Sequence, residues 1–144
     1  MNPAKILLID DEEGFLGAMT RRLEKRGLKT ITALSGQEGI SVLKDNPDVD
    51  VVILDVKMPG MDGIQVLKEI KRQFAVIEVI MLTAHGTLES AIEGMKLGAF
   101  DYLMKPCEID ELMKKVEEAK QKRRDHQRRI LEAEGKHLAQ TRGV

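Results

Sequence analysis

The 144-residue chain has the length of a single domain and enough apolar residues to build a core without disulfide bonds. Hydrophobic residues make up 42% of it and charged residues 33%, with a net charge of −1, which excludes disordered, collagen-like and disulfide-rich classes. Its apolar runs are far shorter than the roughly 20 residues of a membrane-spanning helix. The single cysteine and the absence of a signal-peptide pattern predict a cytoplasmic protein.

Five short apolar runs alternate with amphipathic segments along the chain. The runs cover residues 5–9, 28–33, 50–54, 76–82 and 100–104. Helical spacing of apolar residues follows each run, over residues 12–26, from 35, from 64, over 87–98 and from 109. Because the runs are apolar throughout, both faces of each strand are expected to be covered. The pattern predicts an α/β fold with a parallel, doubly wound sheet.

Turn and capping residues mark the ends of several of these helices. Gly27 is suited to the left-handed position after the first helix. Ser35 and Glu38 have the spacing of a capping box at the start of the second. Asp62 is expected to cap the third helix and to have no chemical role.

Polar residues stand where four of the five predicted strands end. The first strand ends at Asp10-Asp11, the third at Asp55, the fourth at Thr83 and the fifth at Lys105. Ends of parallel strands meet along one edge of the sheet, where open α/β folds place their ligands. Three carboxylates gathered there repel one another unless a cation lies among them. Oxygen ligands favour a hard ion such as Mg²⁺.

These residue types suit the transfer of a phosphoryl group to a carboxylate. Asp55 follows the strongest strand signal and is the natural nucleophile, since a carboxylate can form an aspartyl-phosphate. The transferred oxygens then need a fixed cation, which Lys105 supplies, and a hydroxyl donor, which Thr83 supplies. Each residue alone also has a structural interpretation as a turn, cap or solvated side chain. Their joint occurrence at successive strand ends favours the interpretation as a phosphoryl-transfer site.

The stretches 6–12, 52–63, 81–86 and 98–106 together resemble the receiver domain of bacterial two-component response regulators. The similarity covers about residues 4–120, and it is greatest to receivers that regulate transcriptional activators of the AAA+ type. The resemblance implies a flavodoxin-like sheet with strand order 2-1-3-4-5 and five helices, the last extended. It also implies two-component phosphorelay signalling by a phosphoprotein that catalyses only its own phosphorylation and dephosphorylation.

The resemblance implies a role for each residue at the strand ends. Asp55 accepts the phosphoryl group from a sensor histidine kinase or a phosphotransfer protein. The Mg²⁺ ligands are Asp10, Asp11, Asp55 and the backbone carbonyl of Lys57. Thr83 and Lys105 bind the phosphoryl oxygens.

Further residues are implied to switch, tune or shape the site. Tyr102 is the aromatic residue that swings inward as Thr83 moves. The alternative interpretation of Tyr102 is an ordinary core side chain with no switching role. The positions implied to tune the phosphoryl lifetime and access are Lys57, Ala84 and His85, although His85 also suits a plain exposed loop. Structural roles are implied for Pro59, Gly63 and Pro106, with a cis Lys105–Pro106 bond.

The expected output surface combines the fourth helix, the fifth strand and the fifth helix. Phosphorylation is expected to shift a two-state equilibrium of this surface. A phosphorylation-dependent homodimer through it is one expectation, and the downstream effector is not indicated by the sequence.

Residues 121–144 form a basic extension to the predicted receiver. Residues 114–144 carry 10 Lys and Arg against 5 Asp and Glu, whereas residues 1–113 carry 13 against 19. Three interpretations stay open: a helix that pairs with a second copy, a spacer to an effector domain, and a solvated helix that frays. Direct nucleic-acid binding through its arginines is not expected, because no recognition motif accompanies them.

Three other functions fit the sequence less well than a receiver does. An aspartate-nucleophile phosphatase would carry an acid two residues after the nucleophile, where this chain has Lys57. A flavodoxin-like cofactor carrier needs a phosphate-binding loop after the first strand, where residues 10–13 are all acidic. A degenerate receiver that serves only as a dimerisation surface is disfavoured by the complete set of site residues.

Overall fold

A five-stranded parallel sheet lies at the centre of the structure, a computed structural model that describes residues 3–56 and 62–142, with side chains described to residue 136. The strands are β1 (Lys5–Ile9), β2 (Lys29–Ala33), β3 (Val51–Leu54), β4 (Glu78–Thr83) and β5 (Asp101–Met104). Their order in the sheet is β2-β1-β3-β4-β5, and all neighbouring pairs are parallel. The predicted doubly wound fold and its strand order are confirmed.

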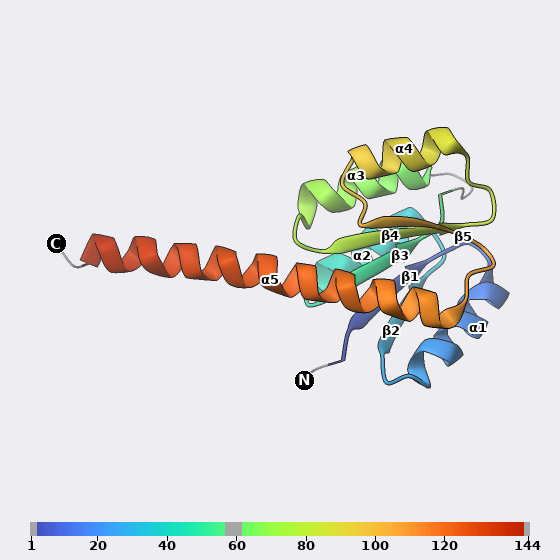
Figure 1. Cartoon of the computed structure of the whole chain (residues 1–144), viewed down its shortest axis with the longest axis horizontal. Helices are drawn as coiled ribbons and strands as arrows, with labels where there is room; N and C mark the ends of the chain where they lie inside the picture. The colour runs from blue at the N-terminus through green and yellow to red at the C-terminus, as the bar shows by residue number, and fades with distance from the viewer. Residues whose placement is uncertain (1–2, 57–61, 143–144) are drawn as a thin grey trace.

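Helices cover both faces of the sheet (Figure 1). They are α1 (Glu13–Glu24), α2 (Gly36–Asp45), α3 (Gly63–Gln73), α4 (Leu88–Lys96) and α5 (Ile109–Arg142). Helices α1 and α5 pack on one face, and α2, α3 and α4 lie on the other. The second half of α5 continues beyond the body as a single projecting helix (Figure 1). Within the described residues, no helix is both long and apolar enough to span a membrane.

Covered faces on both sides explain why the central strands β1, β3 and β4 are buried without alternation, whereas the edge strands β2 and β5 are partly exposed, contrary to the expectation for every strand. In β1, Ile6 and Leu8 point into the core under α1 and α5, while Leu7 and Ile9 point into the core under α2 and α3. All four side chains are at most 1% exposed. Burial of each such side chain contributes roughly 1.5–3 kcal/mol, so the covered strands carry much of the fold's stability.

The ends of the helices follow local sequence signals. Gly27 has a positive φ of 84° after α1, as expected. Ser35 caps α2 by accepting a hydrogen bond from the Glu38 N–H at 3.1 Å, but Glu38 accepts from the Leu34 N–H and not from Ser35. The predicted capping box is therefore only half formed, because the glutamate reaches one residue further back.

The first strand and the start of the last helix lie where predicted, and the other predicted limits differ from the observed ones by at most two residues. The fourth strand, expected from residue 76, begins at Glu78 because the Ile77 N–H donates to the Phe74 carbonyl and closes a turn. Asp62 caps α3 as expected, with its carboxylate accepting from the Ile64 N–H at 2.9 Å.

Candidate functional site

The register of the strands brings the predicted polar residues to one edge of the sheet. Ile9 of β1 pairs with Leu54 of β3, so the next residues along each strand, Asp10 and Asp55, are neighbours. The Asp55 N–H donates to the Ile9 carbonyl at 3.0 Å and fixes this placement. Residues 45 positions apart therefore share one site because the two strands are parallel.

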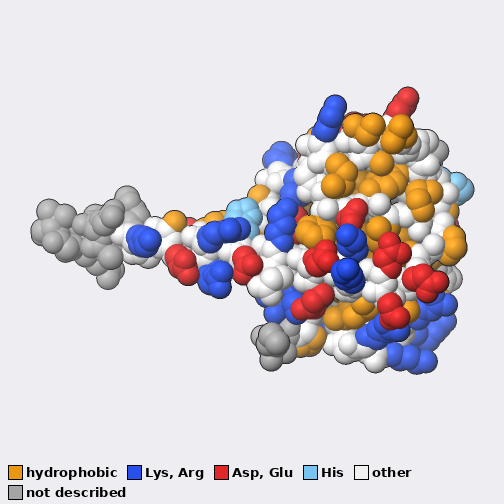
Figure 2. All heavy atoms as spheres, in the orientation of Figure 1, with side chains coloured by type: hydrophobic (Ala, Val, Ile, Leu, Met, Phe, Trp, Pro, Cys, Tyr) orange, Lys and Arg blue, Asp and Glu red, His pale blue; other side chains and the backbone are white. Residues whose placement is uncertain are grey.

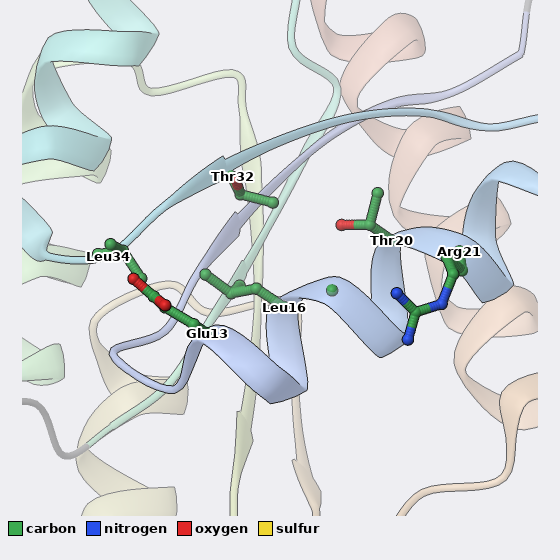
Figure 3. Close-up of a pocket in the computed structure, with 7 residues that line it drawn as sticks. Glu13, Leu16, Thr20, Arg21, Thr32 and Leu34 are labelled. Carbon is green, nitrogen blue, oxygen red and sulfur yellow. The ribbon is translucent and has the colours of Figure 1, made fainter.

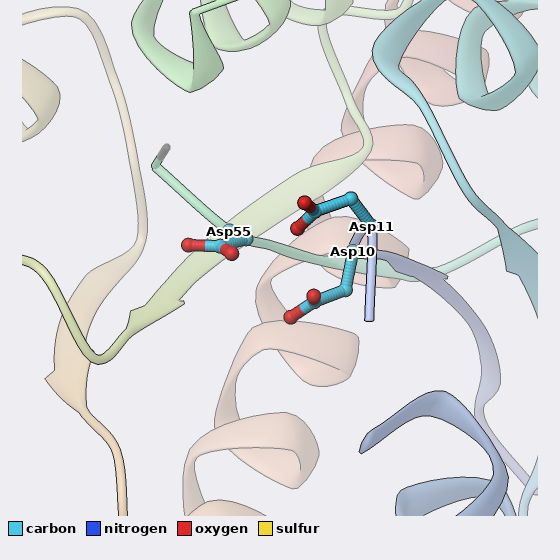
Figure 4. A group of neighbouring side chains, drawn as sticks. All are labelled: Asp10, Asp11 and Asp55. Carbon is cyan, nitrogen blue, oxygen red and sulfur yellow. The ribbon is translucent and has the colours of Figure 1, made fainter. Parts of the chain in front are cut away.

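Three carboxylates extend from these strand ends toward a common point (Figure 4). Asp10, Asp11 and Asp55 each offer an oxygen, and these oxygens lie within 4.8 Å of one another. Asp10 and Asp55 are only 2% and 4% exposed, whereas Asp11 is exposed. Two buried acids and one open acid make a site with one accessible side.

Lys105 crosses to this acidic cluster from the end of β5. Its Nζ lies 2.6 Å from Asp10 Oδ2 and 4.0 Å from Asp55 Oδ2. The ammonium group also lies 3.8 Å from the centre of the Phe15 ring, a cation–π contact. The backbone N–H of Lys105 donates to the Thr83 carbonyl at 2.9 Å, and this bond keeps the ends of β4 and β5 together. The peptide bond to Pro106 is cis, as the resemblance implied.

Asp10 has both of its carboxylate oxygens engaged. Oδ1 accepts from the Glu12 N–H at 3.0 Å and so shapes the turn that leads into α1. Oδ2 accepts from Lys105. Asp10 thus acts here as a structural acceptor and as a member of the cluster.

The residues after β4 line the other side of the site. Thr83 is fully buried, and its Oγ1 accepts from the His85 N–H at 3.1 Å. Ala84 and His85 are exposed. Ala84 lines a hollow of about 370 Å³ together with Lys105 and Phe15, so the approach to Lys105 is open beside a small side chain.

Tyr102 is half-buried and points toward α4. Its hydroxyl lies 2.8 Å from Ser90 Oγ. Ser90 also closes a capping box with Thr87, since each side chain accepts the other's backbone N–H at 3.0 Å. A Cβ added to Gly86 would collide with the Tyr102 hydroxyl, so glycine there makes room for the ring. Sequence reasoning missed Ser90, although its spacing to Thr87 is a capping signal.

Gly63 lies at the point where α3 starts against the end of β3. Its N–H donates to the Val56 carbonyl at 2.7 Å. A Cβ at this position would lie 2.6 Å from Val56 Cα and would collide with the Asp55 carbonyl. Only glycine therefore permits this approach beside the acidic cluster. The predicted positions Lys57 and Pro59 lie outside the described residues.

A second hollow lies between α1 and β2 (Figure 3). Its charged side chains are not gathered at one point as those of the strand-end cluster are. It has a volume of about 490 Å³, and Glu13 and Arg21 are its charged lining residues. These two residues lie eight positions apart on α1, which is more than two helical turns. The strand-end cluster is therefore the stronger candidate for chemistry.

Known proteins resemble this chain in sequence. Residues 6–117 match the family model described as the response regulator receiver domain. The chain is 40% identical over 117 residues to the transcriptional regulatory protein GlrR of Escherichia coli, covering 81% of this chain and 26% of that protein. It is 39% identical over 114 residues to the DNA-binding transcriptional regulator NtrC of Salmonella typhimurium, covering 79% and 24%. The chain thus spans about a quarter of the length of these relatives.

Solved structures with a similar fold include response regulators. A response regulator receiver domain protein from Clostridium thermocellum has a TM-score of 0.80 and 42% identity, covering 84% of this chain and 97% of the other. NtrX from Brucella abortus, solved in complex with ADP, has a TM-score of 0.80 and 30% identity, covering 88% and 29%. With its parallel five-stranded sheet and its match over residues 6–117, the chain belongs to the response regulator receiver domain family, the signalling domain of two-component systems.

Proposed function

We propose that Asp55 accepts a phosphoryl group from a sensor histidine kinase or a phosphotransfer protein, with Mg²⁺ bound beside it. The observation that carries this proposal is the cluster of Asp10, Asp11 and Asp55, with ligand oxygens within 4.8 Å of one another. Lys105 stands next to the same carboxylates.

The donor set suits Mg²⁺. All three side chains offer carboxylate oxygens, which hard divalent cations prefer, and the exposed side of Asp11 leaves room for the water ligands that Mg²⁺ retains. Asp10, Asp11 and Asp55 would hold the ion, with the Lys57 carbonyl proposed as a further ligand. When bound, the ion neutralises negative charge on the carboxylates and on the incoming phosphoryl oxygens.

The protein's own groups supply the nucleophile and the remaining positive charge. An Asp55 oxygen forms a bond to phosphorus while the bond from phosphorus to the donor's imidazole nitrogen breaks. Lys105 turns from Asp10 toward a phosphoryl oxygen, a small movement because it already lies 4.0 Å from Asp55. Thr83 donates its hydroxyl to another oxygen. Small Ala84 keeps the approach open, and Lys57 and His85 tune how fast water removes the group.

The signal leaves the site through Thr83, Tyr102 and α4. Movement of Thr83 toward the phosphoryl group makes space for Tyr102, which then leaves Ser90. The neighbouring face of α4 and β5 exposes four apolar side chains, and hydrophobic side chains are visible over α4 in Figure 2. They are Leu88, Ile92, Met95 and Met104. Phosphorylation therefore shifts the population of two states of the α4-β5-α5 surface.

The output is control of a downstream partner, not turnover of an external substrate. Transcriptional regulators among the relatives support an effector that acts on transcription. A homodimer through the α4-β5-α5 surface is one route to that output, and the cytoplasm is the compartment proposed.

Acetyl phosphate labelling tests the proposal. With Mg²⁺ present, intact-mass measurement should show a gain of one phosphoryl group, which EDTA and the Asp55→Asn substitution should each abolish. Asp45→Asn, at an exposed position of α2, is the matched control and should label normally. Full labelling of Asp55→Asn would overturn the assignment.

A further inference from the structure

Two buried acids lie at the N-terminal ends of the strands, at the opposite end of the sheet from Asp55. Asp50 directly precedes β3 and Glu78 begins β4, and each is 2% exposed. Burial of a carboxylate is costly unless a cation and hydrogen bonds compensate for its lost hydration. The cations that pair with these two acids are Lys122 and Arg124 of α5 and Lys71 of α3.

Asp50 is held by Arg124 in a two-bond arrangement. The guanidinium Nε and Nη2 donate to Asp50 Oδ1 and Oδ2 at 3.1 and 3.0 Å. The Lys5 N–H donates to Oδ2 at 3.0 Å. This geometry is the strong form of an ion pair, and it raises the pKa of Arg124 above its usual value. It joins α5 directly to the beginnings of β1 and β3.

Neighbouring contacts extend this attachment. Arg124 Nη2 also donates to the Pro3 carbonyl at 3.2 Å, and Arg123 Nη2 donates to the Pro47 carbonyl at 3.0 Å. Both acceptors lie in segments that lead into strands. Two successive arginines of α5 therefore bind the two segments that lead into β1 and β3.

Glu78 receives lysines from both faces of the sheet. Lys71 of α3 lies 3.5 Å from Glu78 Oε1, and Lys122 of α5 lies 3.4 Å from Oε2. Since α3 and α5 pack on opposite faces, the Glu78 carboxylate links the two helical layers across the N-terminal end of β4. Loss of either lysine would leave a buried charge with weaker compensation.

After Arg124 the character of α5 changes. Arg128 pairs with Asp125 and Glu132 of its own helix at 3.4 and 3.9 Å, and residues 131–136 are all exposed. Figure 2 shows charged side chains of both signs along this projecting part. An exposed polar helical segment is only marginally stable by itself, so it needs an anchored end.

We infer that Lys122, Arg123 and Arg124 form a clamp on Asp50, Glu78 and the Pro47 carbonyl, which makes the start of the extension part of the folded receiver. The structural unit then ends at about Arg124, beyond the boundary at residue 120 expected from the sequence. The clamp anchors the free part of α5 and sets its direction from the body. The basic charges of residues 122–124 are engaged by the protein's own acids and carbonyls.

Hydrogen exchange on the full chain tests the clamp. Arg124→Gln should speed exchange of the amides of residues 121–136 by about tenfold or more, because the anchored end of the segment is lost. Arg128→Gln is the matched control, since it removes an arginine of the same helix that pairs only weakly and locally. It should leave amide exchange of residues 121–124 unchanged.

A distance measurement gives a second readout. Spin labels on Lys44→Cys and Ala133→Cys, in a Cys107→Ser background, should show one narrow distance distribution that broadens in Arg124→Gln. If that variant fails to fold, Arg124→Lys, which keeps the charge but loses the paired bonds, provides the same comparison. Unchanged amide exchange and an unchanged distance distribution in the clamp variant would overturn the inference.

Discussion

Lys105 Nζ lies 2.6 Å from Asp10 Oδ2 but 4.0 Å from Asp55 Oδ2. The lysine is thus bonded to a proposed metal ligand and stands beside the proposed phosphoacceptor. Two positive groups, the ammonium and a bound divalent ion, would compete for the carboxylates of Asp10 and Asp55. This competition makes the lysine a determinant of metal affinity as well as a phosphoryl ligand.

Removal of the lysine charge should therefore strengthen Mg²⁺ binding. Lys105→Gln is expected to bind Mg²⁺ roughly tenfold more tightly, because a unit charge 2.6 Å from Asp10 and 4.0 Å from Asp55 is lost. The same variant should label more slowly with acetyl phosphate. Isothermal titration calorimetry measures the affinity. Lys115→Gln, which loses a pair with Asp101 on β5, is the control and should bind Mg²⁺ as the unaltered protein does. Weaker binding by Lys105→Gln would contradict the competition.

Ser90 should couple Tyr102 to the start of α4. Ser90→Ala removes both the Tyr102 contact and one bond of the capping box, and is expected to cost the first turn of α4 about 1 kcal/mol. Faster amide exchange at residues 88–91 is the measurable result. Tyr102→Phe keeps the capping box and should have a smaller effect. Equal exchange in all three proteins would show that the hydroxyl contact does not stabilise α4.

Gly63 should tolerate no side chain. Gly63→Ala is expected to destabilise the fold by about 1–3 kcal/mol, because its Cβ would overlap the backbone of Asp55 and Val56. Urea denaturation measures the loss. Gly135→Ala is the control: nothing lies within 4 Å of a Cβ there, and alanine favours a helix. A Gly63→Ala protein as stable as the control would contradict the close approach.

Cys107 should react slowly with alkylating reagents near neutral pH. Burial raises the pKa of its thiol, and the negative charges of Glu111 and Glu108 raise it further. Since the thiolate is the reactive form, the alkylation rate should rise at a higher pH than for an unstructured cysteine. Glu111→Gln should shift this profile back toward lower pH. An alkylation rate that rises at a lower pH than that of a free cysteine would contradict a buried thiol beside two acids.

Much of the fold, and the meeting of the polar residues at the strand ends, could be predicted from the sequence. Continuous apolar runs such as residues 6–9 and 51–54 identified buried parallel strands, and parallel strands place their ends together. That rule alone brought Asp10, Asp55 and Lys105 into one site. Residue spacing also identified the caps at Ser35 and Asp62.

Side-chain partners that depend on packing between distant elements could not be predicted. The bond from Arg124 to Asp50 spans 74 residues, and an acid before a strand resembles an ordinary turn residue until α5 is placed over it. Ser90 and Tyr102 meet only because α4 packs beside β5. The sequence also did not determine where the last helix ends, and α5 runs as one helix from Ile109 to Arg142.

Chemical mapping of the phosphoryl group tests the central claim most directly. After brief acetyl phosphate treatment with Mg²⁺, borohydride reduction converts an aspartyl-phosphate to homoserine, and peptide sequencing by mass spectrometry locates it. We predict homoserine at position 55 alone, and none when Mg²⁺ is withheld. Homoserine at position 10 or 11, or none at position 55 with Mg²⁺ present, would contradict the assignment of Asp55 as the phosphoacceptor.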